Sequence, residues 1–197
     1  MKSTIFTAKF GKYCETAEHS ALAHYEDMDG RKWIIWVNSY MICRIPSASY
    51  ADEMQQFTKS DAPELGTVKS LRDCPMRFDS VLKLWNDMHN SLDVPAISSP
   101  FCAEIPDDAG KKKKSVRVVI LKPENSDPSP VIIDQRYLDL FIDPVAASGK
   151  NAVSAVRFWL GGWKDCEAMI LPIRISAQDA AVRRGVDGIA AAYRREA

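Results

Sequence analysis

The sequence predicts an α+β protein in which a strand, a helix and an antiparallel meander occur twice, over about residues 3–46 and 131–175. In the stretch 131–144, a β-branched run leads into apolar residues at helical spacing, and a proline follows. Over 21–46, three strand-like runs are separated by turn residues. We therefore expect one domain over 1–175, with residues 47–130 inserted as a helix and a hairpin, and a C-terminal amphipathic helix over 176–197.

The first repeat contains the clearest β pattern in the chain. Its predicted elements are a strand over 3–6, a helix over 8–19 and strands over 22–26, 32–37 and 40–45. Asp29-Gly30 predicts a hairpin turn, because glycine adopts the positive φ that such turns need. Asn38-Ser39 breaks the next run, and Pro46 ends the last strand.

The pattern that predicts secondary structure is weak at the start of the insertion and stronger in two later segments. Residues 47–71 indicate a connecting region with a short helix over 50–57. Apolar residues at helical spacing predict a helix over 75–92, with Pro75 in its first turn. Strands over 101–105 and 115–121 are expected to form a hairpin with a charged tip.

The second repeat begins with a predicted buried strand over 131–133. Asp134 is placed to act as the N-cap of a helix, because its carboxylate can accept a hydrogen bond from an unpaired backbone N–H. Tyr137 and Phe141 share the apolar face of that helix, so both are expected to be buried, and Pro144 ends it. Strands over 155–160 and 166–171 then flank Gly161-Gly162, and the last helix is expected over 177–195.

Charge and composition narrow the possible functions. The 197 residues include 26 basic and 26 acidic ones, so no global field attracts nucleic acid or an anionic membrane. Neither a signal-peptide core nor a run of 18 apolar residues is found, and we expect a cytoplasmic protein without a membrane partner. The five cysteines are widely spread, which disfavours a disulfide framework and a zinc site.

Two basic clusters are the candidate contacts for nucleic acid or a protein partner. One lies at the hairpin tip of the insertion and could grip phosphates or simply form a solvated loop. The other lies on the polar side of the C-terminal helix and could form a binding stripe or only a soluble face. The candidate residues are Lys111, Lys112, Lys113, Lys114, Arg183, Arg184, Arg194 and Arg195.

The sequence carries no catalytic signature, phosphate-binding loop or dinucleotide fingerprint, and we expect no cofactor and no metal. His19 and His24 are five residues apart, which does not place two metal ligands on one helix face. Residues 27–30 begin like a calcium loop but lack the later ligands, so a turn is favoured.

The repeated strand, helix and meander resemble the half-domain repeat of the sliding clamps, the processivity factors of DNA polymerases. In the first repeat the resemblance rests on residues 25–45, with a turn, a strand, a break at Asn38 and another strand. In the second, residues 131–141 look like a clamp strand and its helix, and Met169-Ile-Leu-Pro-Ile-Arg-Ile175 resembles a bacterial closing strand. The resemblance implies a clamp-like fold, protein partners in DNA metabolism and self-association.

The helices that would line a clamp's hole are not basic, because acidic residues offset their lysines and arginine. We therefore expect weak or indirect binding to nucleic acid.

The sequence is compatible with two functions. The first is a non-enzymatic clamp-like binding module that recruits replication or repair proteins through a hydrophobic surface pocket or contacts DNA through the basic clusters. The second is a small enzyme whose site forms only in three dimensions, for which the first residues to examine are His24, Asp27, Asp29 and Cys43.

Overall fold

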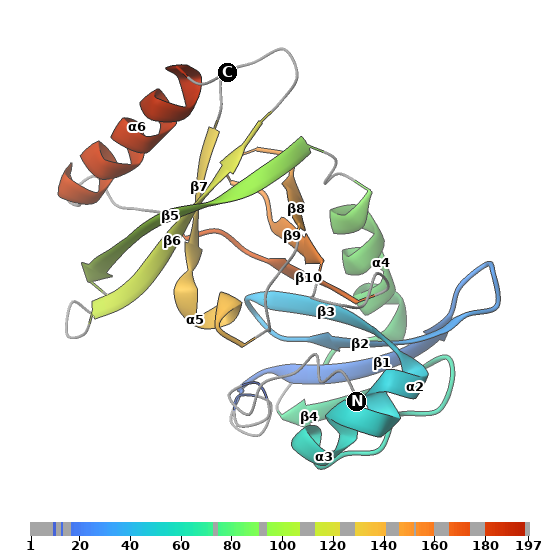
Figure 1. Ribbon diagram of the computed structural model, residues 1–197. Helices are drawn as coiled ribbons and strands as arrows, with labels where there is room; N and C mark the ends of the chain where they lie inside the picture. The colour runs from blue at the N-terminus through green and yellow to red at the C-terminus, as the bar shows by residue number, and fades with distance from the viewer. Residues whose placement is uncertain are drawn as a thin grey trace.

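The computed structural model describes residues 10, 13, 17–72, 75–90, 94–106, 113–122, 129–140, 146–151, 153–159, 166–173 and 180–195. These residues confirm the α+β class. They form an antiparallel sheet of ten strands in the order β4-β1-β2-β3-β10-β9-β8-β5-β6-β7, with helices around it (Figure 1). The predicted strand over 3–6 lies outside the described residues.

The meander of the first repeat is confirmed. It consists of β1 (Ser20–Glu26), β2 (Lys32–Val37) and β3 (Met41–Pro46). Gly30 has the positive φ expected at the turn, at 77°. The Asp27 carboxylate accepts the backbone N–H groups of Asp29 and Arg31 at 3.0 and 2.9 Å. The turn is therefore fixed by local hydrogen bonds.

The helix expected over 8–19 is only partly described. Phe10 and Tyr13 are helical, whereas residues 17–19 are not, and His19 has a φ of 52°. A non-glycine residue at positive φ cannot continue a right-handed helix. The helix therefore ends before Ala17, earlier than the apolar spacing predicts.

The region 47–71 contains a strand that the sequence pattern misses. The helix expected over 50–57 is a continuous segment of α2 (Ser47–Ser49), η1 (Tyr50–Met54, a π-helical turn) and α3 (Gln55–Thr58). After it, β4 (Thr67–Arg72) pairs antiparallel with β1. β4 is an edge strand with mostly exposed side chains, so it lacks the apolar alternation that reveals a half-buried strand.

The helix and hairpin of the insertion are confirmed with changed bounds. α4 (Phe78–His89) is shorter than the range 75–92, and Pro75 precedes it instead of lying in its first turn. β5 (Val94–Pro106) and β6 (Lys113–Leu121) pair antiparallel and extend further than expected.

The second repeat contains a shorter helix and one additional strand. β7 (Ser129–Asp134) pairs with β6, and Asp134 caps α5 (Gln135–Leu138) by accepting the N–H of Arg136 at 3.0 Å. Tyr137 is only partly buried, and Phe141 lies outside the described residues. β8 (Ala146–Gly149) was not predicted, whereas β9 (Val156–Trp159) and β10 (Glu167–Ile170) form the expected hairpin.

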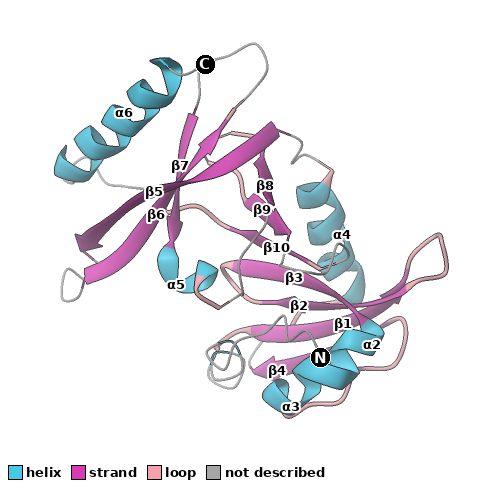
Figure 2. Cartoon of the chain, in the orientation of Figure 1, coloured by secondary structure: helices cyan, strands magenta, loops and turns pink. Residues whose placement is uncertain are grey.

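The sheet curls around the main hydrophobic core. β2 and β6 are far apart in the sheet order (Figure 2). Both contribute buried side chains to the same cluster. Phe10 and the α5 residue Leu138 belong to this cluster, and the rings of Tyr13 and Tyr137 meet edge to face at 6.0 Å. The described residues of the two repeat helices therefore pack on the same side of the sheet.

Two further helices cover other parts of the sheet. α4 packs Val81 and Trp85 against β1, β2 and β3, on the side opposite the main core. α6 (Ala180–Arg195), the expected C-terminal helix, packs Val186 over β6 and β7. No helix within the described residues is long and apolar enough to cross a membrane.

Candidate functional site

An apolar pocket of about 340 Å³ lies where the first repeat, the insertion and the second repeat meet. Its walls come from the β2–β3 turn, from α4 with the residue Met76 before it, and from the end of β10. The lining residues are His19, Val37, Asn38, Ser39, Tyr40, Met41, Ile42, Met76, Leu84, Met88, Met169 and Leu171.

Local hydrogen bonds hold the turn that forms one wall. The side-chain oxygen of Asn38 accepts the N–H groups of Tyr40 and Met41 at 3.0 and 2.9 Å. The N–H of Leu171 donates to the Tyr40 carbonyl at 2.9 Å, which joins the turn to the end of β10. The walls from the two repeats are therefore fixed relative to each other before any ligand arrives.

The pocket opening is apolar and exposed. Tyr40, Leu84 and Leu171 are 56%, 37% and 43% exposed, which is unusual for large hydrophobic side chains grouped around one cavity. The lining also includes four methionines, whose flexible side chains adapt to different apolar shapes. Such a pocket suits one or two apolar side chains of a binding partner.

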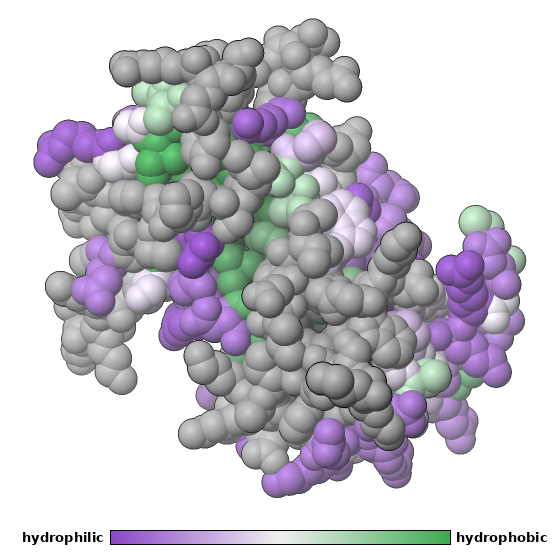
Figure 3. Space-filling model, in the orientation of Figure 1, coloured by the Kyte–Doolittle hydropathy of each residue, from purple (hydrophilic) through white to green (hydrophobic). Residues whose placement is uncertain are grey.

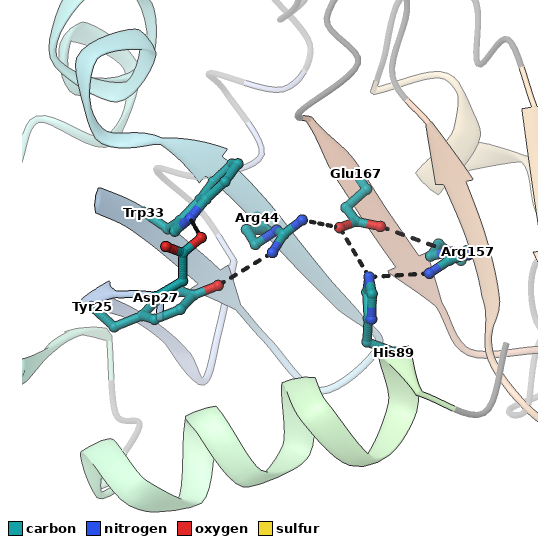
Figure 4. Close-up of polar contacts among 7 residues, drawn as sticks. All are labelled: Tyr25, Asp27, Trp33, Arg44, His89, Arg157 and Glu167. Carbon is teal, nitrogen blue, oxygen red and sulfur yellow. Dashed lines mark hydrogen bonds and ion pairs between the residues drawn. The ribbon is translucent and has the colours of Figure 1, made fainter. Parts of the chain in front are cut away.

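A cluster of ion pairs lies between α4 and the sheet (Figure 4). Its centre is Glu167 of β10, whose side chain is 5% exposed. Oε1 of Glu167 accepts from Nη2 of Arg44 on β3 at 2.5 Å and lies 3.3 Å from Nε2 of His89 on α4. Oε2 lies 3.8 Å from Nε of Arg157 on β9. The Glu167 carboxylate thus links its own strand, β10, to β3, to β9 and to α4.

Nε2 of His89 makes a second contact in the cluster. Nη1 of Arg157 lies 3.0 Å from Nε2 of His89, and a guanidinium can only donate. Nε2 therefore accepts from Arg157 when it carries no hydrogen, and donates to Oε1 of Glu167 when it carries one. Burial alone would raise the pKa of Glu167, but the hydrogen bond to His89 and the positive charges of Arg44 and Arg157 outweigh it and lower that pKa.

Aromatic rings surround the guanidinium groups. The Arg44 guanidinium lies 4.2 Å from the ring centre of Trp33 and 5.1 Å from that of Trp85, and Arg157 lies 4.4 Å from that of Trp159. These distances are within the range of cation–π attraction, which offsets part of the cost of burying the charges. The cluster therefore fixes α4, one wall of the pocket, to the sheet.

The structure describes the predicted basic residues only in part. Lys111 and Lys112 lie outside the described residues, and Lys113 and Lys114 lie in β6 without described side chains. Arg183 and Arg184 are exposed on α6. Arg194 and Arg195 also lie in α6, again without described side chains.

The residues chosen for the enzyme alternative do not form one site. Cys43 is fully buried, and Asp27 is held in its turn. A hydrogen bond from the indole of Trp33, at 2.8 Å, is the main cause of the lowered pKa of Asp27. His24 contacts Ser47 and the loop before β4, away from Asp27. Among the described residues, no three His, Cys, Asp or Glu side chains lie close enough to hold a metal ion.

The sequence predicts a hydrophobic surface pocket but does not indicate which residues line it. Met76, Leu84 and Leu171 come from separate segments, and no local spacing connects them. The residues of the ion-pair cluster are also far apart in sequence, since Arg44 and Glu167 are separated by 123 positions. An isolated glutamate in a predicted apolar strand, as at 167, is the one local signal that could have indicated a buried ion pair.

No protein-family model matches the chain, and no curated protein matches it. Among solved structures, the chain is similar to a DNA polymerase III subunit beta DnaN sliding clamp from Bartonella birtlesii LL-WM9, with 11% sequence identity and a TM-score of 0.38. The match covers 85% of this chain, which spans 65% of the length of that clamp chain. A similarity with so low a TM-score and sequence identity supports no conclusion about function.

Proposed function

We propose that the protein is a binding module that holds a short segment of a partner protein in the apolar pocket between α4, the β2–β3 turn and the end of β10. The observation that carries this proposal is the group of exposed apolar residues, Tyr40, Leu84 and Leu171, around one preformed cavity. Small binding sites in proteins are typically concave, mostly apolar and largely formed before the ligand binds.

The occupant suggested by this lining is a peptide with apolar anchor side chains. The cavity of about 340 Å³ is at the small end of the range for ligand sites, so it fits one or two side chains and not a large cofactor. Hot spots of peptide binding are anchor residues that become fully desolvated in such pockets. Adaptable methionine walls also suit a module that accepts several related partner segments.

Further properties of this module are suggested by the sequence patterns that resemble the sliding-clamp family. They suggest a single domain over 1–175, a role with protein partners in DNA replication or repair, a cytoplasmic location and a capacity for self-association. Contact with nucleic acid would be weak or indirect and would use Lys111, Lys112, Lys113, Lys114, Arg183, Arg184, Arg194 and Arg195.

The experiment uses fluorescein-labelled eight-residue peptides that carry two adjacent leucine or phenylalanine residues among polar ones. Fluorescence anisotropy would measure their binding to the full-length protein and to the variant Leu171→Glu. A carboxylate at the pocket opening should cost about 2 kcal/mol or more, which corresponds to roughly 30-fold weaker binding.

The matched control is Met28→Glu, which changes a fully exposed apolar residue at the tip of the β1–β2 hairpin. This tip is otherwise hydrophilic (Figure 3). It adjoins the first residue of β2, whereas the pocket is lined by Val37, the last residue of β2. Met28→Glu should leave peptide binding unchanged. Equal binding by Leu171→Glu and the wild type, with both proteins folded, would show that the pocket is not the binding site.

A further inference from the structure

His24 and Ser47 form a hydrogen-bonded pair outside the pocket. Nε2 of His24 lies 3.1 Å from Oγ of Ser47, and Nδ1 lies 2.9 Å from the carbonyl oxygen of Pro63. A carbonyl oxygen can only accept, so Nδ1 carries the proton of the neutral imidazole. Nε2 is then unprotonated and accepts the hydroxyl proton of Ser47. This is the tautomer that a general base needs beside a serine nucleophile.

The third group of the arrangement is held in place by its own loop. Residues 60–66 are fixed at one end because the hydroxyl of Tyr50 donates to the Ser60 carbonyl at 2.7 Å. At the other end, the N–H of Gly66 donates to the carbonyl of His24 at 2.8 Å. The Pro63 carbonyl is thereby positioned to orient the imidazole, as a carboxylate does in a catalytic triad.

The pair lies at a partly exposed place on the protein. His24 and Ser47 are both partly exposed, and Ala48 beside them is exposed. Ser47 is the first residue of the helical segment that continues into η1. π-helical turns are rare and occur frequently at functional sites, and this one directly follows the serine and its helical turn.

We propose that Ser47 is a nucleophile activated by His24, and that the pair accepts acyl groups from small activated carboxylic esters. Oγ of Ser47 forms a bond to the ester carbonyl carbon while its proton passes to Nε2 of His24. The bond from that carbon to the leaving oxygen breaks, and the leaving group takes the proton from Nε2. Water then attacks the acyl-serine by the same route, which releases the carboxylic acid and restores both residues.

A fluorophosphonate probe tests the nucleophile directly in the full-length protein. Ser47 should displace fluoride and form one phosphonate ester, seen by intact mass and located by peptide mapping. The same protein should hydrolyse p-nitrophenyl acetate. Ser47→Ala should lose the adduct and the hydrolysis, whereas Ser80→Ala, which changes an exposed serine on α4, should keep both.

The variant His24→Asn distinguishes a catalytic role of His24 from a structural one. The asparagine amide can still donate to the Pro63 carbonyl near the position of Nδ1, but it cannot accept a proton as a base. General bases contribute about 10²- to 10⁴-fold, so labelling of His24→Asn should slow by at least about 100-fold while its melting temperature stays close to that of the wild type. Equal labelling rates in folded His24→Asn and wild type, or an adduct on any serine except Ser47, would overturn the proposal.

Discussion

Replacing Glu167 by Gln should strongly destabilise the protein, because it removes a buried carboxylate that contacts two partly buried guanidinium groups. The side chains of Arg44 and Arg157 are only 20% and 15% exposed. Glutamine has the same shape and can still accept a hydrogen bond from Arg44, so the substitution removes charge and little else. The negative charge between Arg44, Arg157 and His89 is then lost.

The size of the effect follows from the burial of the cluster. Breaking a buried ion pair by removing one partner costs about 3 to 5 kcal/mol. Because both arginines keep some solvent contact and aromatic neighbours, we expect the lower end, about 3 kcal/mol. For a domain of this size, 1 kcal/mol shifts the melting temperature by roughly 2 to 4 °C. Glu167→Gln should therefore melt about 6 to 12 °C below the wild type.

The destabilisation caused by Glu167→Gln should also depend on pH, which provides a second measurement. The pKa of folded Glu167 is lowered, so its contribution to stability is fully present above the unfolded pKa of about 4.3 and is lost as the pH falls through the folded value. The difference in unfolding free energy between wild type and Glu167→Gln should thus shrink below about pH 4. Urea denaturation at pH 7 and pH 3.5 would measure it.

The matched control is Glu26→Gln, which neutralises an exposed glutamate at the end of β1. It should change the melting temperature by less than about 2 °C, because exposed ion pairs contribute little. If Glu167→Gln were as stable as this control, the ion-pair cluster would contribute nothing to the fold, and the account of how α4 is held would be wrong.

Three further variants test other parts of the structure. Asp134→Ala removes the N-cap of α5 and should cost about 1 kcal/mol in a urea melt, and an unchanged midpoint would show that the cap is unimportant. Phe158→Ala empties a buried site of the main core and should cost about 3 to 5 kcal/mol, whereas a loss under 1 kcal/mol would contradict its place there. Duplex DNA should bind weakly, with an affinity that falls steeply with salt and drops when Lys111, Lys112, Lys113 and Lys114 become Ser. Tight binding in high salt would refute this electrostatic account.

The elements that could be predicted are those with a strong local pattern. β2 and β3 alternate or run apolar between clear turn residues, and α4 and α6 repeat apolar residues at helical spacing. β4 and β8 could not be found this way. β4 is an exposed edge strand, and β8 is Ala-Ala-Ser-Gly, so the pairing of each with its neighbours comes from tertiary context.

The candidate sites depend on long-range contacts, which sequence periodicity does not report. His24 could be selected as a residue to examine, but its partners Ser47 and Pro63 are 23 and 39 positions away. The meander of β1, β2 and β3 and the loop before β4 bring them together. The pocket likewise exists because the end of β10 lies beside the β2–β3 turn, a neighbourhood set by the strand order.

The pocket and the ion-pair cluster act on the same element. Met88 lines the pocket, and the next residue of α4, His89, contacts Glu167 and Arg157. On the sheet, Arg157 is paired directly with Met169, another pocket residue. A peptide bound in the pocket, as proposed, would favour α4 in its observed position, and so does the carboxylate of Glu167. Since a ligand that binds only the folded state stabilises it by mass action, peptide binding and the cluster would then support each other. Glu167→Gln would loosen α4 and weaken peptide binding although it changes no residue that lines the pocket.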